Sequence, residues 1–100
     1  MIEATFQSHF MSILERNYPA ATVIKVDPTF RKSFPDVIML GPGSFWGAFE
    51  TKRAYGSPQQ PNQSYYIDVM DAQCFGRFVQ PENLEEVLRD LEQAIYFGCS

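Results

Sequence analysis

The chain has 100 residues, of which 45% are hydrophobic and 15% aromatic, and this composition excludes a disordered polymer. We expect one compact domain covering residues 1–100. No apolar run reaches the roughly 20 residues that span a bilayer, and residues 1–18 lack the pattern of a signal peptide, so we expect a cytoplasmic protein with no membrane contact. Two cysteines, Cys74 and Cys99, with one histidine, His9, cannot form a four-ligand zinc site, and we expect both thiols to be reduced.

The net charge of −4 argues, taken alone, against a nucleic-acid partner. The charges are unevenly distributed, however. Residues 25–53 carry five cations against three acids, whereas residues 80–100 carry five acids against one cation. The middle of the chain is therefore mildly basic, although a solvated acidic helix at the end of the chain would explain the same asymmetry.

The first third of the chain predicts a helix followed by a strand. Apolar residues recur at spacings of three and four over residues 2–17, which predicts an amphipathic helix that ends before Pro19. The β-branched run ATVIKV at residues 21–26 predicts a short strand. Residues 27–33 are polar and contain a proline, so we expect them to form a connection.

Residues 35–52, PDVIMLGPGSFWGAFETK, predict a β-hairpin because Gly and Pro cluster between two apolar runs. A turn centred on Pro42 and Gly43 pairs residues whose numbers sum to about 85, which places Asp36 opposite Phe49 and beside Glu50. Side chains alternate along a strand, so Glu50 and its second neighbour, Lys52, should point to one face and Thr51 to the other. The two carboxylates could then share one cation.

The remainder predicts a loop, a helix, a strand and a helix. Residues 53–61 are rich in Gly, Pro and Gln and predict a loop, after which Asn62 caps a helix over residues 63–72. Residues 74–79 predict the last strand. Pro81 opens a final helix that Gly98 ends, with apolar side chains at helical spacing between them. The order αβββαβα predicts a mixed sheet with helices packed on it.

Several short motifs resemble those of one nuclease superfamily. Pro35-Asp36 at the start of one strand, followed by Glu50-Thr51-Lys52 at the end of the next, is similar to the signature of the PD-(D/E)XK nucleases. Glu3 in the first helix and the order of the later elements resemble the phage junction-resolving endonucleases and the small standalone phage members of the VRR-NUC branch. The resemblance implies a restriction-endonuclease-like α/β fold.

The resemblance also implies a metal site. Hydrolysis of a phosphodiester requires a cation that activates water and neutralises charge on the phosphate, and Mg²⁺ needs only one or two carboxylates. Asp36 and Glu50 would be side-chain ligands, and the carbonyl of Thr51 a further ligand. Lys52 would hold or deprotonate the attacking water, or stabilise the phosphate, and Glu3 would bind a second metal or order water. We expect Mg²⁺, with Mn²⁺ as a substitute, and no small-molecule cofactor.

The expected partner is DNA, and the expected reaction is endonucleolytic cleavage, on branched DNA such as four-way (Holliday) junctions. A homodimer would supply the two sites that a symmetric cut needs. A structure-unselective or single-strand nuclease, and a non-catalytic nucleic-acid-binding module, remain alternatives. The residues expected to contact DNA are Lys25, Arg31, Lys32, Arg53 and Gln63.

Each candidate residue also has a plain structural interpretation. Asp36 could be a turn residue, Glu50 with Lys52 an exposed strand face, and Glu3 an acid that favours a helix N-terminus. Gln63 could be an ordinary polar position, because the tyrosine expected four residues later is Ile67. The adjacent tyrosines at positions 65 and 66 could stack on bases or pack.

Overall fold

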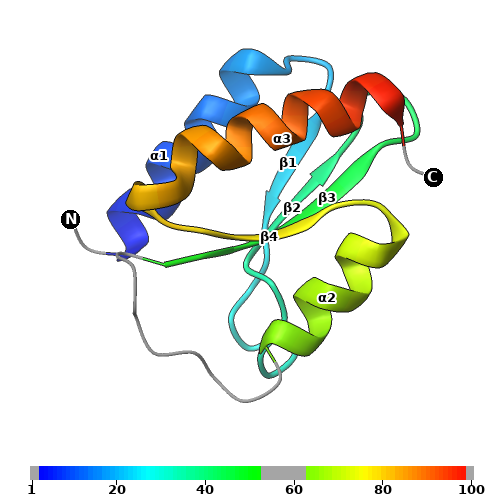
Figure 1. Ribbon diagram of the computed structural model, residues 1–100. Helices are drawn as coiled ribbons and strands as arrows, with labels where there is room; N and C mark the ends of the chain where they lie inside the picture. Colours follow the sequence, from blue (N-terminus) through cyan, green and yellow to red (C-terminus); the bar gives the residue numbers. More distant parts are fainter. Residues whose placement is uncertain (1–2, 53–62, 99–100) are drawn as a thin grey trace.

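A computed structural model describes residues 3–52 and 63–98, with side chains for 5–52 and 64–98. The elements are α1 (Glu3–Asn17), β1 (Thr22–Lys25), β2 (Val37–Leu40), β3 (Trp46–Thr51), α2 (Gln63–Gln73), β4 (Gly76–Val79), a 3-10 turn (Pro81–Asn83) and α3 (Leu84–Phe97) (Figure 1). The predicted αβββαβα order is confirmed. The predicted final helix begins with the separate 3-10 turn.

The four strands form one mixed sheet in the order β1-β2-β3-β4. β1 pairs with β2, and β2 with β3, in antiparallel fashion, whereas β4 pairs with β3 in parallel after the crossover through α2. A tight loop over residues 41–45 joins β2 to β3, and a longer segment over residues 26–36 joins β1 to β2. The parallel pair of β3 and β4 needs the crossover connection that contains α2. The fold class predicted from the sequence, a mixed α/β sheet with helices packed on it, is confirmed.

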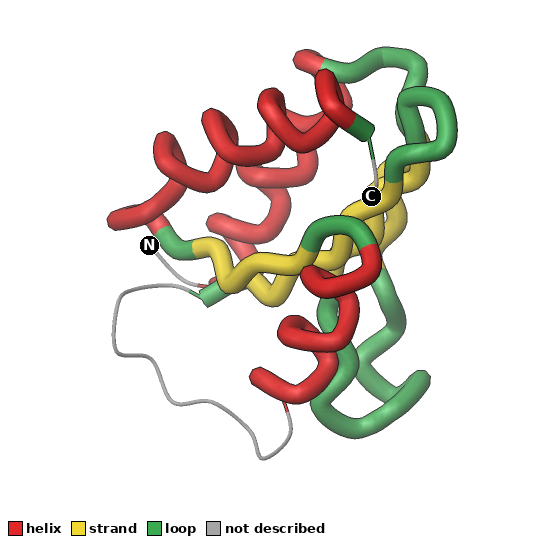
Figure 2. The backbone as a smooth tube through the Cα atoms, turned by 45° about the vertical axis from the view of Figure 1, so that its right-hand side comes forward, coloured by secondary structure: helices red, strands yellow, loops and turns green. Residues whose placement is uncertain are grey.

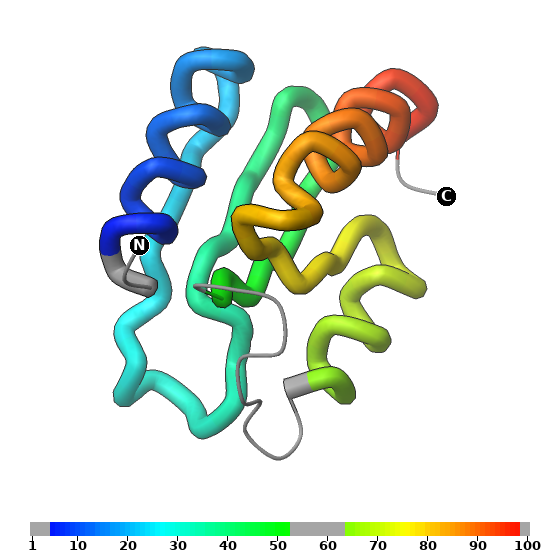
Figure 3. The backbone as a smooth tube through the Cα atoms, turned by 60° about the vertical axis from the view of Figure 1, so that its left-hand side comes forward, coloured from blue at the N-terminus to red at the C-terminus, as the bar shows by residue number. Residues whose placement is uncertain are grey.

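The helices cover the two faces of the sheet unequally. α1 and α3 lie together on one face, and α2 packs on the other (Figures 1 and 3). The apolar stripe of α1 predicted from its spacing is buried against the sheet, as is part of that of α3. The core between these layers contains Phe6, Phe10, Leu14, Val37, Met39, Phe45, Phe49, Phe75, Val79, Val87 and Leu91.

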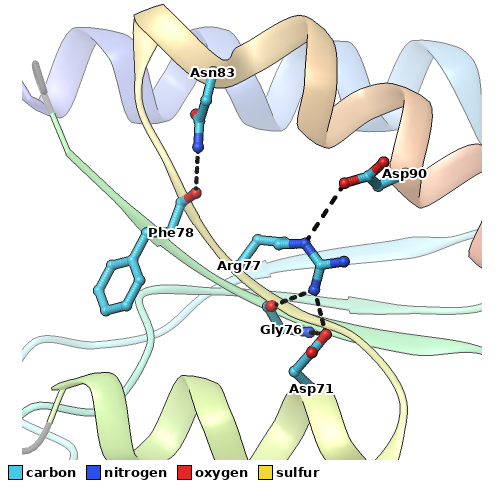
Figure 4. Close-up of polar contacts among 6 residues, drawn as sticks. All are labelled: Asp71, Gly76, Arg77, Phe78, Asn83 and Asp90. Carbon is cyan, nitrogen blue, oxygen red and sulfur yellow. Dashed lines mark hydrogen bonds and ion pairs between the residues drawn. The ribbon is translucent and has the colours of Figure 1, made fainter.

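Polar contacts, and the close packing of Gly76 against α2, hold β4 between α2 and α3. Arg77 forms an ion pair with Asp71 of α2, and its Nε lies 3.9 Å from an oxygen of Asp90 on α3 (Figure 4). The Asn83 side chain donates to the Phe78 carbonyl at 3.0 Å. A Cβ on Gly76 would come within 2.6 Å of a backbone oxygen of α2, so only glycine permits this distance between β4 and α2.

Two predictions made from local patterns need correction. The hairpin pairs Val37 with Phe49 and Leu40 with Trp46, so the numbers of paired residues sum to one more than expected. The turn is centred on Gly43, whose φ of 64° glycine readily adopts, rather than between Pro42 and Gly43. Cys74 is disulfide-bonded, so the prediction of a reduced thiol, which rested on the number of cysteines and the expected compartment, is wrong for this residue, and Cys99 lies outside the described residues.

No helix in the parts of the chain that the structure describes has the length and apolar character needed to cross a bilayer.

Candidate active site

A local irregularity at the base of the hairpin orients the first candidate acid. The ladder pairs Phe49 with Val37, yet the Asp36 amide also donates to the Phe49 carbonyl, at 3.0 Å. Two consecutive residues on one strand therefore lie against one residue on its neighbour, which is the arrangement of a β-bulge. The predicted position of Asp36 opposite Phe49 is correct, but it arises from the bulge and not from the predicted register.

The Asp36 carboxylate is held by three donors. Its Oδ1 accepts the Thr51 amide at 3.0 Å, and its Oδ2 accepts the Thr51 hydroxyl at 2.6 Å and the Gln7 side-chain amide at 2.8 Å. These donors come from β3 and α1, so the carboxylate connects three elements. An ionised carboxylate has about four acceptor sites, so the three hydrogen bonds leave capacity for a further ligand.

Glu50 of β3 and Lys52, the residue directly after β3, form a buried pair. Their side chains lie on the same face, with Lys52 Nζ 3.8 Å from Glu50 Oε2, so the predicted alternation along this strand is confirmed. Glu50 is 7% exposed and Lys52 is 6% exposed. Removing each of these two charged groups from water costs several kcal/mol. Proteins accept such a cost mainly at functional sites. The alternative of an exposed strand face is therefore wrong.

Both candidate acids line one open cavity of about 510 Å³. One wall is the end of β1 and the segment between β1 and β2, which together carry three exposed cations, Lys25, Arg31 and Lys32, and one exposed acid, Asp27. The structure thus brings together two predicted metal ligands and three of the predicted DNA-contacting residues. The cavity combines carboxylates with a cationic rim, which suits a cation and a polyanion at the same place.

Local hydrogen bonds order this cationic wall. Asp27 Oδ1 accepts the Thr29 amide at 2.8 Å and the Thr29 hydroxyl at 2.7 Å. These bonds, the hydroxyl first, lower the pKa of the Asp27 carboxyl below its usual value. The Phe30 amide donates to the Asp27 carbonyl and the Phe34 amide to the Arg31 carbonyl, so two turns follow one another and the second contains Arg31 and Lys32.

Two other predicted residues are only partly placed, and a third is not placed. Glu3 is the first residue of α1 and Gln63 the first of α2, but their side chains lie outside the described part of the chain. Arg53 also falls outside the described residues. Their proposed roles remain predictions.

Sequence reasoning missed two contacts at Asp36. The Thr51 side chain was expected to point away from the carboxylates, with only its carbonyl in use, yet its hydroxyl contacts Asp36 because the bulge reorients that acid. Gln7 was not a candidate. It lies one helical turn after Glu3 and therefore on the same face of α1, a spacing that could have identified it.

The donor set at the cavity fits a hard divalent cation. Among residues 3–52 and 63–98 no group of three or more His, Cys, Asp or Glu side chains is arranged to bind a metal. Asp36 and Glu50 nevertheless line one cavity. Mg²⁺ prefers oxygen ligands, retains several waters, and is commonly bound by one or two carboxylates, so this set is sufficient.

No protein-family model and no curated protein matches the sequence. Two solved structures are similar in fold. One, described as "VRR_NUC domain protein", has a TM-score of 0.67 and 16% identity, and the alignment covers 99% of this chain and 92% of that one. Another, described as "VRR_NUC domain", has a TM-score of 0.64 and 19% identity, with coverage of 92% and 96%. The chain therefore has the fold of the VRR_NUC domain.

Proposed function

We propose that this chain is a metal-dependent endonuclease that hydrolyses phosphodiester bonds in DNA. The observation that carries the proposal is the cavity that Asp36 and Glu50 line together with Lys25, Arg31 and Lys32. A binding module would have no need for two carboxylates at a surface that receives phosphates, because they repel the ligand. A nuclease needs them to hold a cation.

The roles of the residues follow from their chemistry. Asp36 and Glu50 hold a divalent cation, Mg²⁺ with Mn²⁺ as a substitute, and the Thr51 carbonyl and Glu3 are proposed as additional ligands. When bound, the cation supplies charge neutralisation and a more acidic bound water. Lys52 contributes a positive charge next to Glu50, where it either stabilises the phosphate or orients the attacking water.

DNA is proposed to approach along the cationic wall. Lys25, Arg31 and Lys32 are exposed and would contact the phosphate backbone, as would Arg53, with Gln63 close to the cleavage site. Backbone contacts of this kind release counterions, so affinity should fall steeply as salt rises.

We further propose a branched DNA substrate, such as a four-way junction, and a homodimeric enzyme. One chain provides one set of Asp36, Glu50 and Lys52. Symmetric cleavage of two strands needs two such sets related by a two-fold axis, which a dimer supplies.

Cleavage of three DNA substrates tests the proposal. A four-way junction, a plain duplex and a single strand of equal concentration are incubated with Mg²⁺, and the products are resolved on denaturing gels. We expect the junction to be cut fastest, and chelation of the metal to stop the reaction. Equal rates on all three substrates would refute junction selectivity. Absence of cleavage on every substrate would refute the nuclease proposal in favour of a binding module.

Thr51→Val should weaken the site without disrupting it. The change removes the hydroxyl that donates to Asp36 at 2.6 Å and keeps the amide that donates at 3.0 Å. Loss of such a supporting contact typically lowers metal affinity by about 10- to 100-fold, so the Mg²⁺ concentration for half-maximal cleavage should rise by that factor. Thr51→Ser keeps the hydroxyl and should restore the wild-type metal requirement. An unchanged Mg²⁺ requirement in Thr51→Val would contradict the positioning role.

A further inference from the structure

Four aromatic rings next to the cavity form a continuous series, which we call the aromatic row. Phe30 contacts Phe34 with ring centroids 5.3 Å apart, Phe34 contacts Tyr66 at 5.3 Å, and Tyr66 contacts Tyr65 at 5.4 Å. All three contacts are edge-to-face. The row joins the segment after β1 to the first turns of α2, two parts of the chain that lie side by side (Figure 2).

The inner and outer rings of the row differ in burial. Phe34 and Tyr66 are half-buried, and their contact packs the segment against α2. The outer rings are largely in solvent, with Phe30 64% and Tyr65 61% exposed. Packing of the segment against α2 therefore accounts for the inner pair but not for the outer pair. Exposed apolar side chains gathered in one place mark a surface that binds a partner.

The surroundings of the row specify the chemistry of that partner. Phe34 lines the same cavity as Asp36 and Glu50, so one inner ring of the row forms part of the wall of the candidate active site. Phe30 directly precedes Arg31 and Lys32, both exposed. The partner must therefore offer negative charge to the cations and flat apolar faces to the rings. A duplex presents phosphates but hides its base faces by stacking, whereas a single strand presents both.

We propose that the aromatic row binds unpaired nucleobases of a DNA strand whose backbone passes through the cavity. The proposal rests on the proposed function and extends it, because it adds unpaired nucleotides next to the cleaved bond to the branch as a second feature of the substrate that is recognised. Phe30 and Tyr65 provide the stacking faces, and the inner pair keeps the two outer rings in place. Cations and aromatic side chains combine in this way wherever proteins hold single strands.

Binding measured without cleavage tests the row. The full chain is titrated, in the presence of a metal chelator, with a fluorescent single-stranded oligodeoxynucleotide and with its duplex of equal length. Phe30→Ala and Tyr65→Ala should each weaken single-strand binding by about fivefold or more, the usual effect of removing one stacking ring. Duplex binding should change by less than about twofold, because paired bases do not reach the rings.

Matched variants separate stacking from other effects. Phe30→Tyr keeps a ring and should bind the single strand as the wild type does. Tyr96→Ala removes an aromatic side chain that is 84% exposed on α3, outside the row, and should have no effect. Lys32→Ala should weaken single-strand and duplex binding alike.

The results that would refute base binding by the aromatic row differ from those that would refute the proposed nuclease function. Wild-type single-strand affinity in both Phe30→Ala and Tyr65→Ala would refute the row, as would equal losses on single strand and duplex. Neither result depends on catalysis, because the titrations contain no free metal. Conversely, the wild type could cleave no DNA while both variants lose affinity for the single strand. That result would refute the nuclease function and support base binding by the aromatic row.

Discussion

Glu50→Gln is expected to lower Mg²⁺-dependent DNA cleavage by about a thousandfold or more. Glutamine keeps the shape of the side chain and removes the negative charge that is proposed to hold the cation beside Lys52. A loss of about 4 kcal/mol of charge stabilisation corresponds to about a thousandfold in rate. The measurement is the single-turnover cleavage rate on the preferred substrate, with far-ultraviolet circular dichroism to show that the fold is intact.

A matched variant makes this result specific. Glu85→Gln makes the same change on an exposed position of α3 and should leave the rate unchanged. Lys52→Ala should also abolish cleavage, because it removes the positive charge paired with Glu50. Full activity in Glu50→Gln or in Lys52→Ala would show that the site has been assigned to the wrong residues.

Phe49→Ala should have the largest effect on stability. Phe49 is fully buried. The centroid of its ring lies 5.0 Å from that of Phe10 on α1 and 5.9 Å from that of Phe75, so Phe49 joins α1 to the sheet. Truncation of a buried phenylalanine costs about 3–5 kcal/mol, out of a total of about 5–15 kcal/mol for a domain of this size. Urea denaturation followed by circular dichroism gives the free energy of unfolding.

The same truncation on the surface provides the control. Phe97 is 80% exposed at the end of α3, and Phe97→Ala should change the free energy of unfolding by no more than about 0.5 kcal/mol. If Phe49→Ala is too unstable to fold, Phe49→Leu should fold with a smaller loss. A loss below about 1 kcal/mol in Phe49→Ala would contradict the central position of this ring in the core.

The parts of the fold that depend on regular periodicity were predictable from the sequence. The stripe that includes Phe6, Phe10 and Leu14 identifies the buried face of α1, and the alternation along β3 places Glu50 and Lys52 together. These patterns repeat over several residues, so one misjudged position does not change the result. The two candidate acids were therefore found from spacing and strand context.

The parts that depend on single-residue geometry were not predictable. The turn is centred on Gly43, so the observed strand pairing differs from the predicted pairing by one residue. The bulge at Asp36 offsets this difference locally and places Asp36 opposite Phe49, as predicted. No composition signal marks such a bulge. The role of the Thr51 hydroxyl depends entirely on it, because only the reoriented carboxylate lies within its reach.

The contacts of Asp36 also determine when the site can form during folding. The hairpin of β2 and β3 is local in sequence, whereas the bond from Gln7 joins residues 29 positions apart. Contacts between distant residues form late, because they carry a larger entropic cost of chain closure. A chain with only its hairpin formed would keep the two contacts from Thr51 to Asp36 but would lack the third donor, Gln7 of α1. Complete fixation of the Asp36 carboxylate is therefore coupled to docking of α1 on the sheet.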